Sequence, residues 1–172
     1  MRIKMARIRK RISMIICTLV AIGVLAGCAA QNGRTFSFLE TQRDFLNCDF
    51  GASREEVVAS ESNVLTDEKV MGDGYMLTYK DIQIDGFNAN LIYMMEDEKF
   101  VQGILYLKTD DVEGVYGQLK SILNEKYGQA VVGLDEATNW ATDKYYVTLL
   151  KSDKVVYSLE PIEHMVEFMS EN

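Results

Sequence analysis

The sequence predicts an α+β fold, a two-layer domain in which helices pack on one face of an antiparallel meander sheet. Several segments alternate apolar and polar residues with a period of two, as strands with one buried face do. One long segment, residues 111–127, instead repeats its apolar residues at three and four positions, as an amphipathic helix does. Helical and alternating segments follow one another twice, so we expect approximately two halves, each a helix plus three strands.

The first half begins with a capping box at Ser53. The Ser53 hydroxyl can accept the backbone N–H of Glu56, and the Glu56 carboxylate can reach back to the N–H of Ser53, which predicts a short helix from this point. The aromatic stretch of residues 36–50 is expected to pack on the core. Asp85-Gly86 lies between two alternating segments and is a hairpin signal. The three strands predicted for this half cover residues 75–84, 87–93 and 100–108.

The second half begins with the helix of residues 111–127. Asp110 or Asp111 can cap its first turn, and Gly128 can adopt the left-handed conformation that follows a last turn. Pro161 suits the first turn of a closing helix. The three strands predicted for this half cover residues 138–142, 145–150 and 155–159.

The first 28 residues have the order of an export signal. Six of the first eleven residues are basic, and residues 12–26 are apolar and end in small side chains. This apolar run of about 15 residues is shorter than the roughly 20 that cross a membrane as a helix. A permanent transmembrane anchor is therefore the weaker interpretation.

The apolar run ends in Leu25, Ala26, Gly27 and Cys28, a sequence that resembles the lipobox of bacterial lipoproteins. The resemblance implies that residues 1–27 are a signal peptide that is removed and that the Cys28 thiol carries diacylglycerol. Residues 28–35 would then be the lipidated cysteine and a short tether, and residues 36–172 a single globular domain. We expect the protein on the extracytoplasmic side of a cell membrane or outer membrane, held there by its lipid anchor.

The charge of the mature chain limits its partners. Six of the 18 basic residues lie in the signal, so the 145 residues left after its removal carry 12 basic and 26 acidic side chains, a formal net charge of −14. Nucleic-acid phosphates and anionic lipid head groups repel such a surface. A nucleic-acid partner is therefore not expected, and membrane attachment must come mainly from the acyl chains.

Few residues have the spacing of a catalytic or metal site. Cys48 is the one cysteine left in the domain, so no intramolecular disulfide forms, and it is expected to be buried as a small apolar group. His164 is the only histidine and is expected at a helix end or on the surface, with Glu163 and Glu167 beside it. The acidic groups do not have the spacing of a calcium loop. The chain also has no Gly-x-Ser-x-Gly motif, which would mark a serine nucleophile. We expect no enzymatic activity, no metal and no cofactor.

Aromatic side chains are the residues most relevant to recognition. Strand tyrosines alternate across the two faces of a sheet, so the face that the helices leave uncovered is expected to present several of them to solvent. Burial of most of them in the core is the alternative explanation. The candidate interface comprises seven tyrosines of the predicted strands: Tyr75, Tyr79, Tyr93, Tyr106, Tyr145, Tyr146 and Tyr157.

A second resemblance covers approximately residues 47–160. A glycine before the capping box, strands, a helix ending in Tyr127-Gly128 and Trp140 in the next strand resemble BamE-like (SmpA/OmlA) lipoproteins and β-lactamase-inhibitor-like domains. The resemblance implies helices on one face of an antiparallel sheet and a non-enzymatic, protein-binding role at the cell envelope. It assigns no functional residue to a position of this chain.

Together these observations predict a membrane-anchored lipoprotein of the cell envelope that acts as a non-catalytic adaptor and binds another envelope protein. The tether, the strand tyrosines and the lack of catalytic spacing carry this hypothesis. The alternative is a lipoprotein that binds a small molecule or a cation near the membrane, which the acidic excess favours. A hydrolase is a third hypothesis, which requires a pocket that joins His164 to a nucleophile.

Overall fold

The computed structural model describes residues 35–133 and 136–171, the last five of these by their backbone alone. The predicted signal peptide, the lipobox with Cys28 and nearly all of the tether lie outside the described residues. Within these residues, no helix combines the length and the apolar character needed to cross a membrane.

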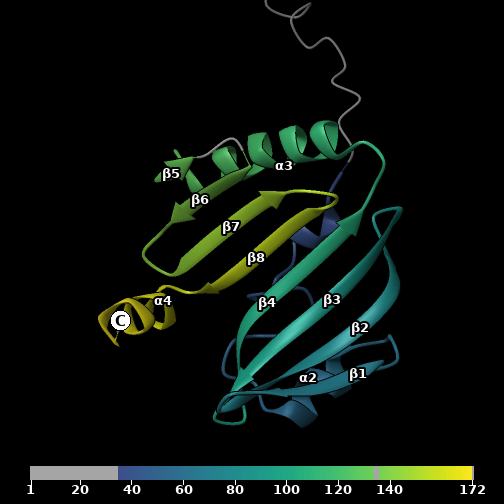
Figure 1. Ribbon diagram of the computed structural model, residues 1–172, viewed down its shortest axis with the longest axis vertical. Coiled ribbons are helices and arrows are strands. Elements are labelled where there is room, and N and C mark those ends of the chain that lie inside the picture. The colour runs from purple at the N-terminus through teal and green to yellow at the C-terminus, as the bar shows by residue number, and fades with distance from the viewer. Residues whose placement is uncertain (1–34, 134–135, 172) are drawn as a thin grey trace, which may run out of the picture. The chain divides into compact units, whose positions relative to one another are not determined.

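A single antiparallel sheet of eight strands forms the framework of residues 35–171 (Figure 1). The strand order is β1-β2-β3-β4-β8-β7-β6-β5, so two meanders meet where β4 pairs with β8. This arrangement confirms the predicted α+β class with an antiparallel sheet. The strands are β1 (Asp67–Met71), β2 (Gly74–Ile84), β3 (Phe87–Glu96), β4 (Lys99–Lys108), β5 (Val132–Gly133), β6 (Ala137–Ala141), β7 (Tyr145–Lys151) and β8 (Val155–Pro161).

Each meander has four strands, one more than the sequence predicted. The missing strands are β1 and β5, which form the two edges of the sheet. All five residues of β1 are exposed and three are charged, and β5 has only two residues. Neither strand buries a face, so neither shows the alternation by which strands are recognised. Charged or very short edge strands are a common means of preventing edge-to-edge pairing.

The helical elements precede or follow the meanders. The capping box of α2 is confirmed: the Ser53 hydroxyl accepts the N–H of Glu56, and the Glu56 carboxylate accepts the N–H of Ser53. Pro161 ends β8, so the closing helix begins one residue later than predicted. The helical elements are η1 (Ser37–Leu39), α2 (Arg54–Ser60), α3 (Val112–Tyr127) and α4 (Ile162–Glu171).

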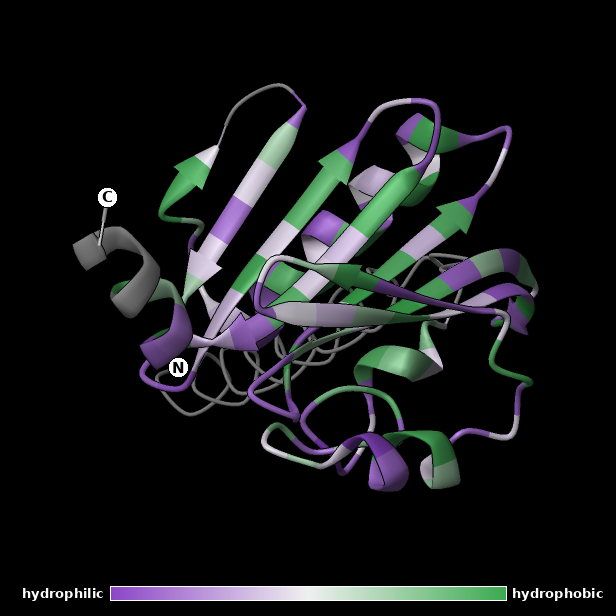
Figure 2. Ribbon diagram, turned by 60° about the horizontal axis from the view of Figure 1, so that its bottom comes forward, coloured by the Kyte–Doolittle hydropathy of each residue, from purple (hydrophilic) through white to green (hydrophobic). Residues whose placement is uncertain are grey.

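The core lies between one face of the sheet and the layer that contains η1, α2 and α3. Figure 2 shows the alternation of hydrophobic and hydrophilic residues along the strands that supplies this face. The Phe45 ring, 2% exposed, packs among Tyr93, Phe100 and Tyr157 with ring centroids 5.9–6.2 Å apart. The stretch of residues 36–50 therefore packs on the core as predicted. We call this side of the sheet the helix-covered face.

Both ends of α3 are fixed by the residues that the sequence indicated. The Asp111 side chain accepts the N–H of Gly114 at 3.0 Å, and Gly128 follows the helix with φ of 84°. Gly114 is packed against its own cap, because an added Cβ would overlap the Asp111 carboxylate. Gly117 differs, since a Cβ at this exposed position would meet no atom within 4 Å.

We expect Gly117→Ala to stabilise the protein by about 0.5–1 kcal/mol, because alanine restricts the unfolded chain and costs less than glycine inside a helix. Urea unfolding of the wild type and the variant measures the change. Gly114→Ala is the matched control on the same helix, and it is expected to destabilise because it disturbs the Asp111 cap. A loss of stability in Gly117→Ala would contradict the open space at this position.

Candidate functional site

The side of the sheet opposite η1, α2 and α3 carries a continuous row of uncharged side chains. The register places Thr78 of β2 beside Ile92, Ile92 beside Ile104, and Ile104 of β4 beside Ser158 of β8. The row continues through Thr148 of β7 to Asn139 of β6, where the Thr148 hydroxyl donates to the Asn139 amide oxygen at 2.9 Å. We call this side the open face.

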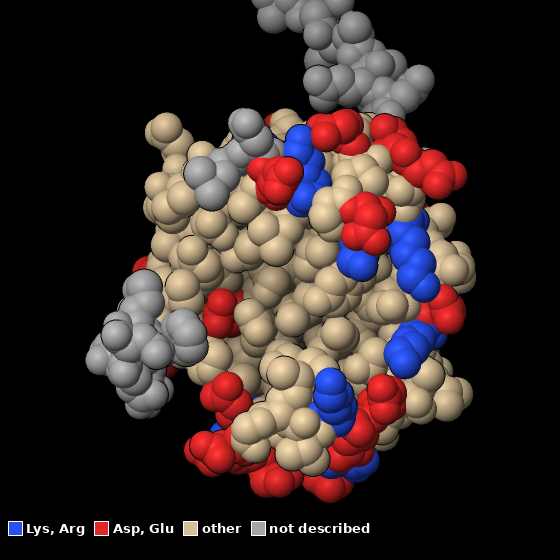
Figure 3. Space-filling view, in the orientation of Figure 1, with Lys and Arg blue, Asp and Glu red and all other residues tan. Residues whose placement is uncertain are grey.

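The open face is uncharged at its centre and charged at its margin. Figure 3 shows lysines, arginines and carboxylates gathered mainly around a broad uncharged area. Ile92, Ile104 and Tyr106 are half-buried, and Leu150 is 39% exposed. An apolar centre with a polar rim is the usual anatomy of a protein–protein interface.

Two of the seven predicted interface tyrosines belong to this face. Tyr106 pairs with Asn90 and Val156 in the strand register, and Tyr146 lies opposite Glu160. Both are half-buried, with part of the side chain accessible. They are the tyrosines that remain as candidate contacts.

The other five tyrosines lie on the helix-covered face, which corrects their assignment to the interface. Tyr79, Tyr93 and Tyr157 are at most 3% exposed and belong to the core. Tyr75 and Tyr145 are half-buried and pack against it. Residues separated by an even number of positions point to the same side of a regular strand, so tyrosines that alternate with outward residues point into the core.

Three of these five inward tyrosines have a carboxylate partner for the hydroxyl. Tyr93 donates to Glu61, Tyr145 donates to Asp44, and Tyr75 donates to Glu98 at 2.8 Å. A buried hydroxyl that is hydrogen-bonded avoids most of its desolvation cost. The partners lie 23 to 101 positions away along the chain, so sequence spacing does not reveal them.

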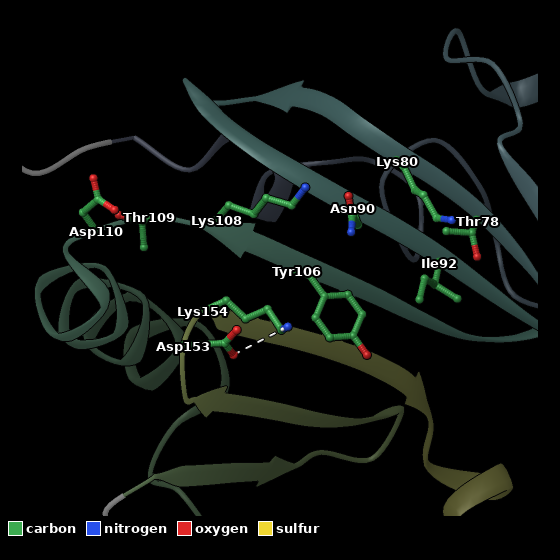
Figure 4. Close-up of a pocket in the computed structure, with 10 residues that line it drawn as sticks. All are labelled: Thr78, Lys80, Asn90, Ile92, Tyr106, Lys108, Thr109, Asp110, Asp153 and Lys154. Atoms are coloured by element: carbon green, nitrogen blue, oxygen red, sulfur yellow. Dashed lines mark ion pairs between the residues drawn. The ribbon is translucent and has the colours of Figure 1, made fainter.

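A cleft of about 650 Å³ opens on the open face where β2, β3 and β4 meet the turn before β8 (Figure 4). Its floor includes Ile92, Asn90 and the Tyr106 ring. Lysines from three different segments surround this floor, and two carboxylates lie at the end nearest α3. The lining residues are Thr78, Lys80, Asn90, Ile92, Tyr106, Lys108, Thr109, Asp110, Asp153 and Lys154.

The cleft is the feature that the sequence did not predict, because its lining residues come from β2, β3, β4 and the turn before β8. Lys80, Asn90 and Lys108 occupy the polar positions of alternating segments, which place them on the open face. That alternation was a usable signal. The sequence gives no such signal for Lys154 in the β7–β8 turn. Only the pairing of β4 with β8 brings this lysine beside Tyr106.

Helix α4 is attached to the sheet through the only histidine. His164 Nδ1 lies 2.8 Å from a Glu160 carboxylate oxygen, and Nε2 lies 3.1 Å from a Glu96 carboxylate oxygen. A neutral imidazole donates through one nitrogen only, whereas the imidazolium donates through both. The geometry therefore fits a protonated His164 that joins α4 to the ends of β8 and β3.

The sequence placed His164 at a helix end with Glu163 and Glu167 as neighbours, but its partners are Glu160 and Glu96. Both partners are carboxylates, and no serine, threonine or cysteine is hydrogen-bonded to the imidazole among the described residues.

We expect the pKa of His164 to lie above the 6.5 of an unperturbed histidine. Burial opposes the charged form, but hydrogen bonds to Glu160 and Glu96 outweigh burial and raise the pKa. A raised folded-state pKa contributes stability that is fully present below pH 6.5 and is lost as the pH rises through the folded pKa. Because the untagged chain has one histidine, an NMR pH titration of its imidazole signal reads the pKa directly.

Glu160→Gln and Glu96→Gln are the variants that test the cause of this shift. Each removes one negative partner, so each is expected to lower the His164 pKa. Glu163→Gln is the control, since Glu163 is exposed and has no hydrogen bond to the ring among the described residues. A wild-type pKa at or below 6.5 would contradict the two-carboxylate arrangement.

Cys48 is buried as predicted, at 5% exposure, and burial raises the pKa of its thiol. It stays a neutral thiol at neutral pH, which is the opposite of what a nucleophile needs. Among the residues that the structure describes, no three His, Cys, Asp or Glu side chains converge as a metal ion would require.

No protein-family model, no curated protein and no solved structure matches the chain.

Proposed function

We propose that this chain is a lipid-anchored protein of the cell envelope that binds another envelope protein through the open face and catalyses no reaction. The anchor part of the proposal rests on the lipobox-like Leu25-Ala26-Gly27-Cys28. The binding part rests on the sheet.

One observation carries the binding part: the uncharged row from Thr78 to Asn139 runs across six strands, while α2 and α3 pack on the other side. A soluble sheet with one face against a core usually has charged or strongly polar residues on the other. Here the second face has Ile92 and Ile104 at its centre and charges at its margin. A partner that covers this centre would remove apolar surface from water, which favours association.

Site-specific photo-cross-linking in intact cells tests the binding part. A photoreactive amino acid at position 104, on the open face, is compared with one at Gln118, which is exposed on α3. We expect one abundant cross-linked protein from position 104 and none from position 118. Ile104→Asp should abolish the complex in a pull-down with that protein, because it places a charge in the apolar centre.

Gln118→Asp is the matched control, since it adds the same charge on the opposite layer. Equal cross-linking from both positions, or a complex that survives Ile104→Asp, would refute binding through the open face. Circular dichroism and the melting temperature of each variant exclude loss of folding as the reason for a lost complex.

Metabolic labelling with an alkyne-modified fatty acid tests the anchor part. We expect label on the wild type and no label on Cys28→Ser, together with release of the variant from the membrane fraction. Cys48→Ser is the control, because Cys48 is buried in the domain and should not affect labelling. Persistent label on Cys28→Ser would disprove lipidation at this residue.

The second candidate function is binding of a small molecule. The 650 Å³ cleft favours it, because this volume is within the size range of small-molecule sites. Its three lysines favour an anionic ligand over a cation. A thermal-shift screen separates the two functions, because a ligand that binds the native state raises the melting temperature of the isolated protein, whereas an adaptor shows no shift without its partner.

A further inference from the structure

The centre of the cleft offers two side-chain groups that are free to donate a hydrogen bond. The Asn90 side-chain oxygen already accepts the backbone N–H of Asp81 at 3.1 Å, which leaves the Asn90 NH₂ group to donate. The Tyr106 hydroxyl has no hydrogen-bond partner among the described residues, although Lys154 lies 5.5 Å from the centre of its ring. A ligand that offers acceptors can therefore bond to both groups.

Two of the three ammonium groups of the cleft are only weakly held by their present partners. Lys80 lies 3.8 Å from Asp67 and Lys154 lies 3.5 Å from Asp153, and neither pair makes a good hydrogen bond. Lys108 is closer to its partner Asp81, at 2.7 Å.

The three partner carboxylates are 54–80% exposed, so each pair is screened by water and contributes little. An ammonium group has three N–H donors, so every one of these lysines retains donors for a ligand.

The two carboxylates that line the cleft lie at one end of it. Asp110 and Asp153 line the end nearest α3, whereas Lys80 and Thr78 line the opposite end (Figure 4). The repulsive long-range field of an acidic chain is screened beyond about 8–10 Å at physiological salt. An anion over Asn90 and the Tyr106 ring has the ammonium groups of Lys80, Lys108 and Lys154 around it, and the carboxylates paired with these lysines are exposed to solvent.

We propose that the cleft is the recognition site for a carboxylate side chain, an aspartate or glutamate of the bound envelope protein. The proposal rests on the proposed function, since it takes the partner to lie on the open face. Ile92 and the Tyr106 ring pack against the apolar part of that partner's side chain. The Asn90 NH₂ group, the Tyr106 hydroxyl and the ammonium groups of Lys108 and Lys154 donate to its two oxygens.

The test uses two capped tripeptides that differ by one group, acetyl-Val-Glu-Val-amide and acetyl-Val-Gln-Val-amide, titrated at constant ionic strength into ¹⁵N-labelled protein. We expect the glutamate peptide to bind about fivefold more tightly than the glutamine peptide. The amide signals that shift should come from residues 78–80, 90–92 and 106–108.

Two triple variants of equal charge provide the matched comparison. Lys80→Gln, Lys108→Gln and Lys154→Gln together should remove the preference for the glutamate peptide. Lys69→Gln, Lys99→Gln and Lys120→Gln lose the same three charges outside the cleft and should retain it. Equal loss in both variants, no binding by the wild type, or a glutamate signal that inorganic phosphate displaces at equal ionic strength would overturn the inference.

The carboxylate site and the open-face function can fail independently of each other. If the protein cross-linked at position 104 still binds the cleft triple variant with wild-type affinity, the open-face function stands and the carboxylate site fails. If Ile104→Asp leaves the complex intact, the open-face function fails whatever the peptides show.

Discussion

Gly103→Ala is expected to destabilise the protein by about 3 kcal/mol, because one methyl group at this position overfills the core. Gly103 lies in the centre of β4, between Tyr93 of β3 and Leu159 of β8. A Cβ built on it would overlap three ring atoms of Phe45, which include the atom that joins the ring to its own Cβ. The clash therefore involves the whole ring and not a flexible end.

The Phe45 ring has no free space into which it can move. Tyr93, Phe100 and Tyr157 surround it, and the side chain is 2% exposed. Chemical unfolding in guanidinium measures the loss of stability. In general, replacement of a strand glycine by alanine is slightly favourable, since alanine restricts the unfolded chain and glycine weakens strand interiors. The sign of the change thus separates a steric effect from a propensity effect.

Gly133→Ala is the matched control for this prediction. Gly133 also lies in a strand, and a Cβ there would meet nothing within 4 Å, so the substitution is expected to be neutral or slightly stabilising. Combining Gly103→Ala with Phe45→Leu should recover part of the loss, because the two side chains share one space. A neutral Gly103→Ala would refute the packing of residues 36–50 on β4.

Elements that bury a face are the ones that sequence patterns predicted well. The α3 boundaries, the Ser53 capping box and the Asp85-Gly86 turn all match, since each depends on residues within a few positions of one another. The edge strand β1 was missed because its five residues are exposed and owe their conformation to pairing with β2. A strand that forms because it pairs with its neighbour has little strand pattern in its own sequence.

The candidate site was predictable at the level of a face and not of its residues. Alternation implies two faces, but it does not say which one the helices cover. That choice depends on Phe45 packing over Gly103, which places the Tyr93 side of β3 inward and leaves Tyr106 outward. The cleft depends further on the pairing of β4 with β8, which joins segments about 50 residues apart. Such long-range pairings lie beyond local sequence patterns.

Tyr93→Phe and Tyr79→Phe are expected to change stability in opposite directions, although both remove one hydroxyl from the same core. The two rings pack edge to face with centroids 6.0 Å apart, and both side chains are fully buried. Burial raises the pKa of Tyr79 to about 12 and that of Tyr93 well above its usual value, so both phenols are protonated at neutral pH. They differ in their partners.

The Tyr93 hydroxyl donates to the carboxylate of Glu61, which is 9% exposed directly after α2. Asn47 donates to the same oxygen at 3.2 Å, and Asn63 donates to the other oxygen at 3.4 Å. Removal of the Tyr93 donor leaves a buried carboxylate under-satisfied, and we expect Tyr93→Phe to cost about 2 kcal/mol. Urea unfolding at pH 7 gives this difference directly.

The Tyr79 hydroxyl has no hydrogen-bond partner among the described residues and is shielded from solvent. An unpaired buried hydroxyl is unfavourable, so Tyr79→Phe is expected to be neutral or to stabilise by up to about 1 kcal/mol. The two variants remove the same atoms and leave nearly the same cavity, so transfer and packing effects cancel in the comparison. A cost for Tyr79→Phe as large as that for Tyr93→Phe would mean that a buried water satisfies Tyr79, and it would refute the assignment of Glu61 as the group that distinguishes them.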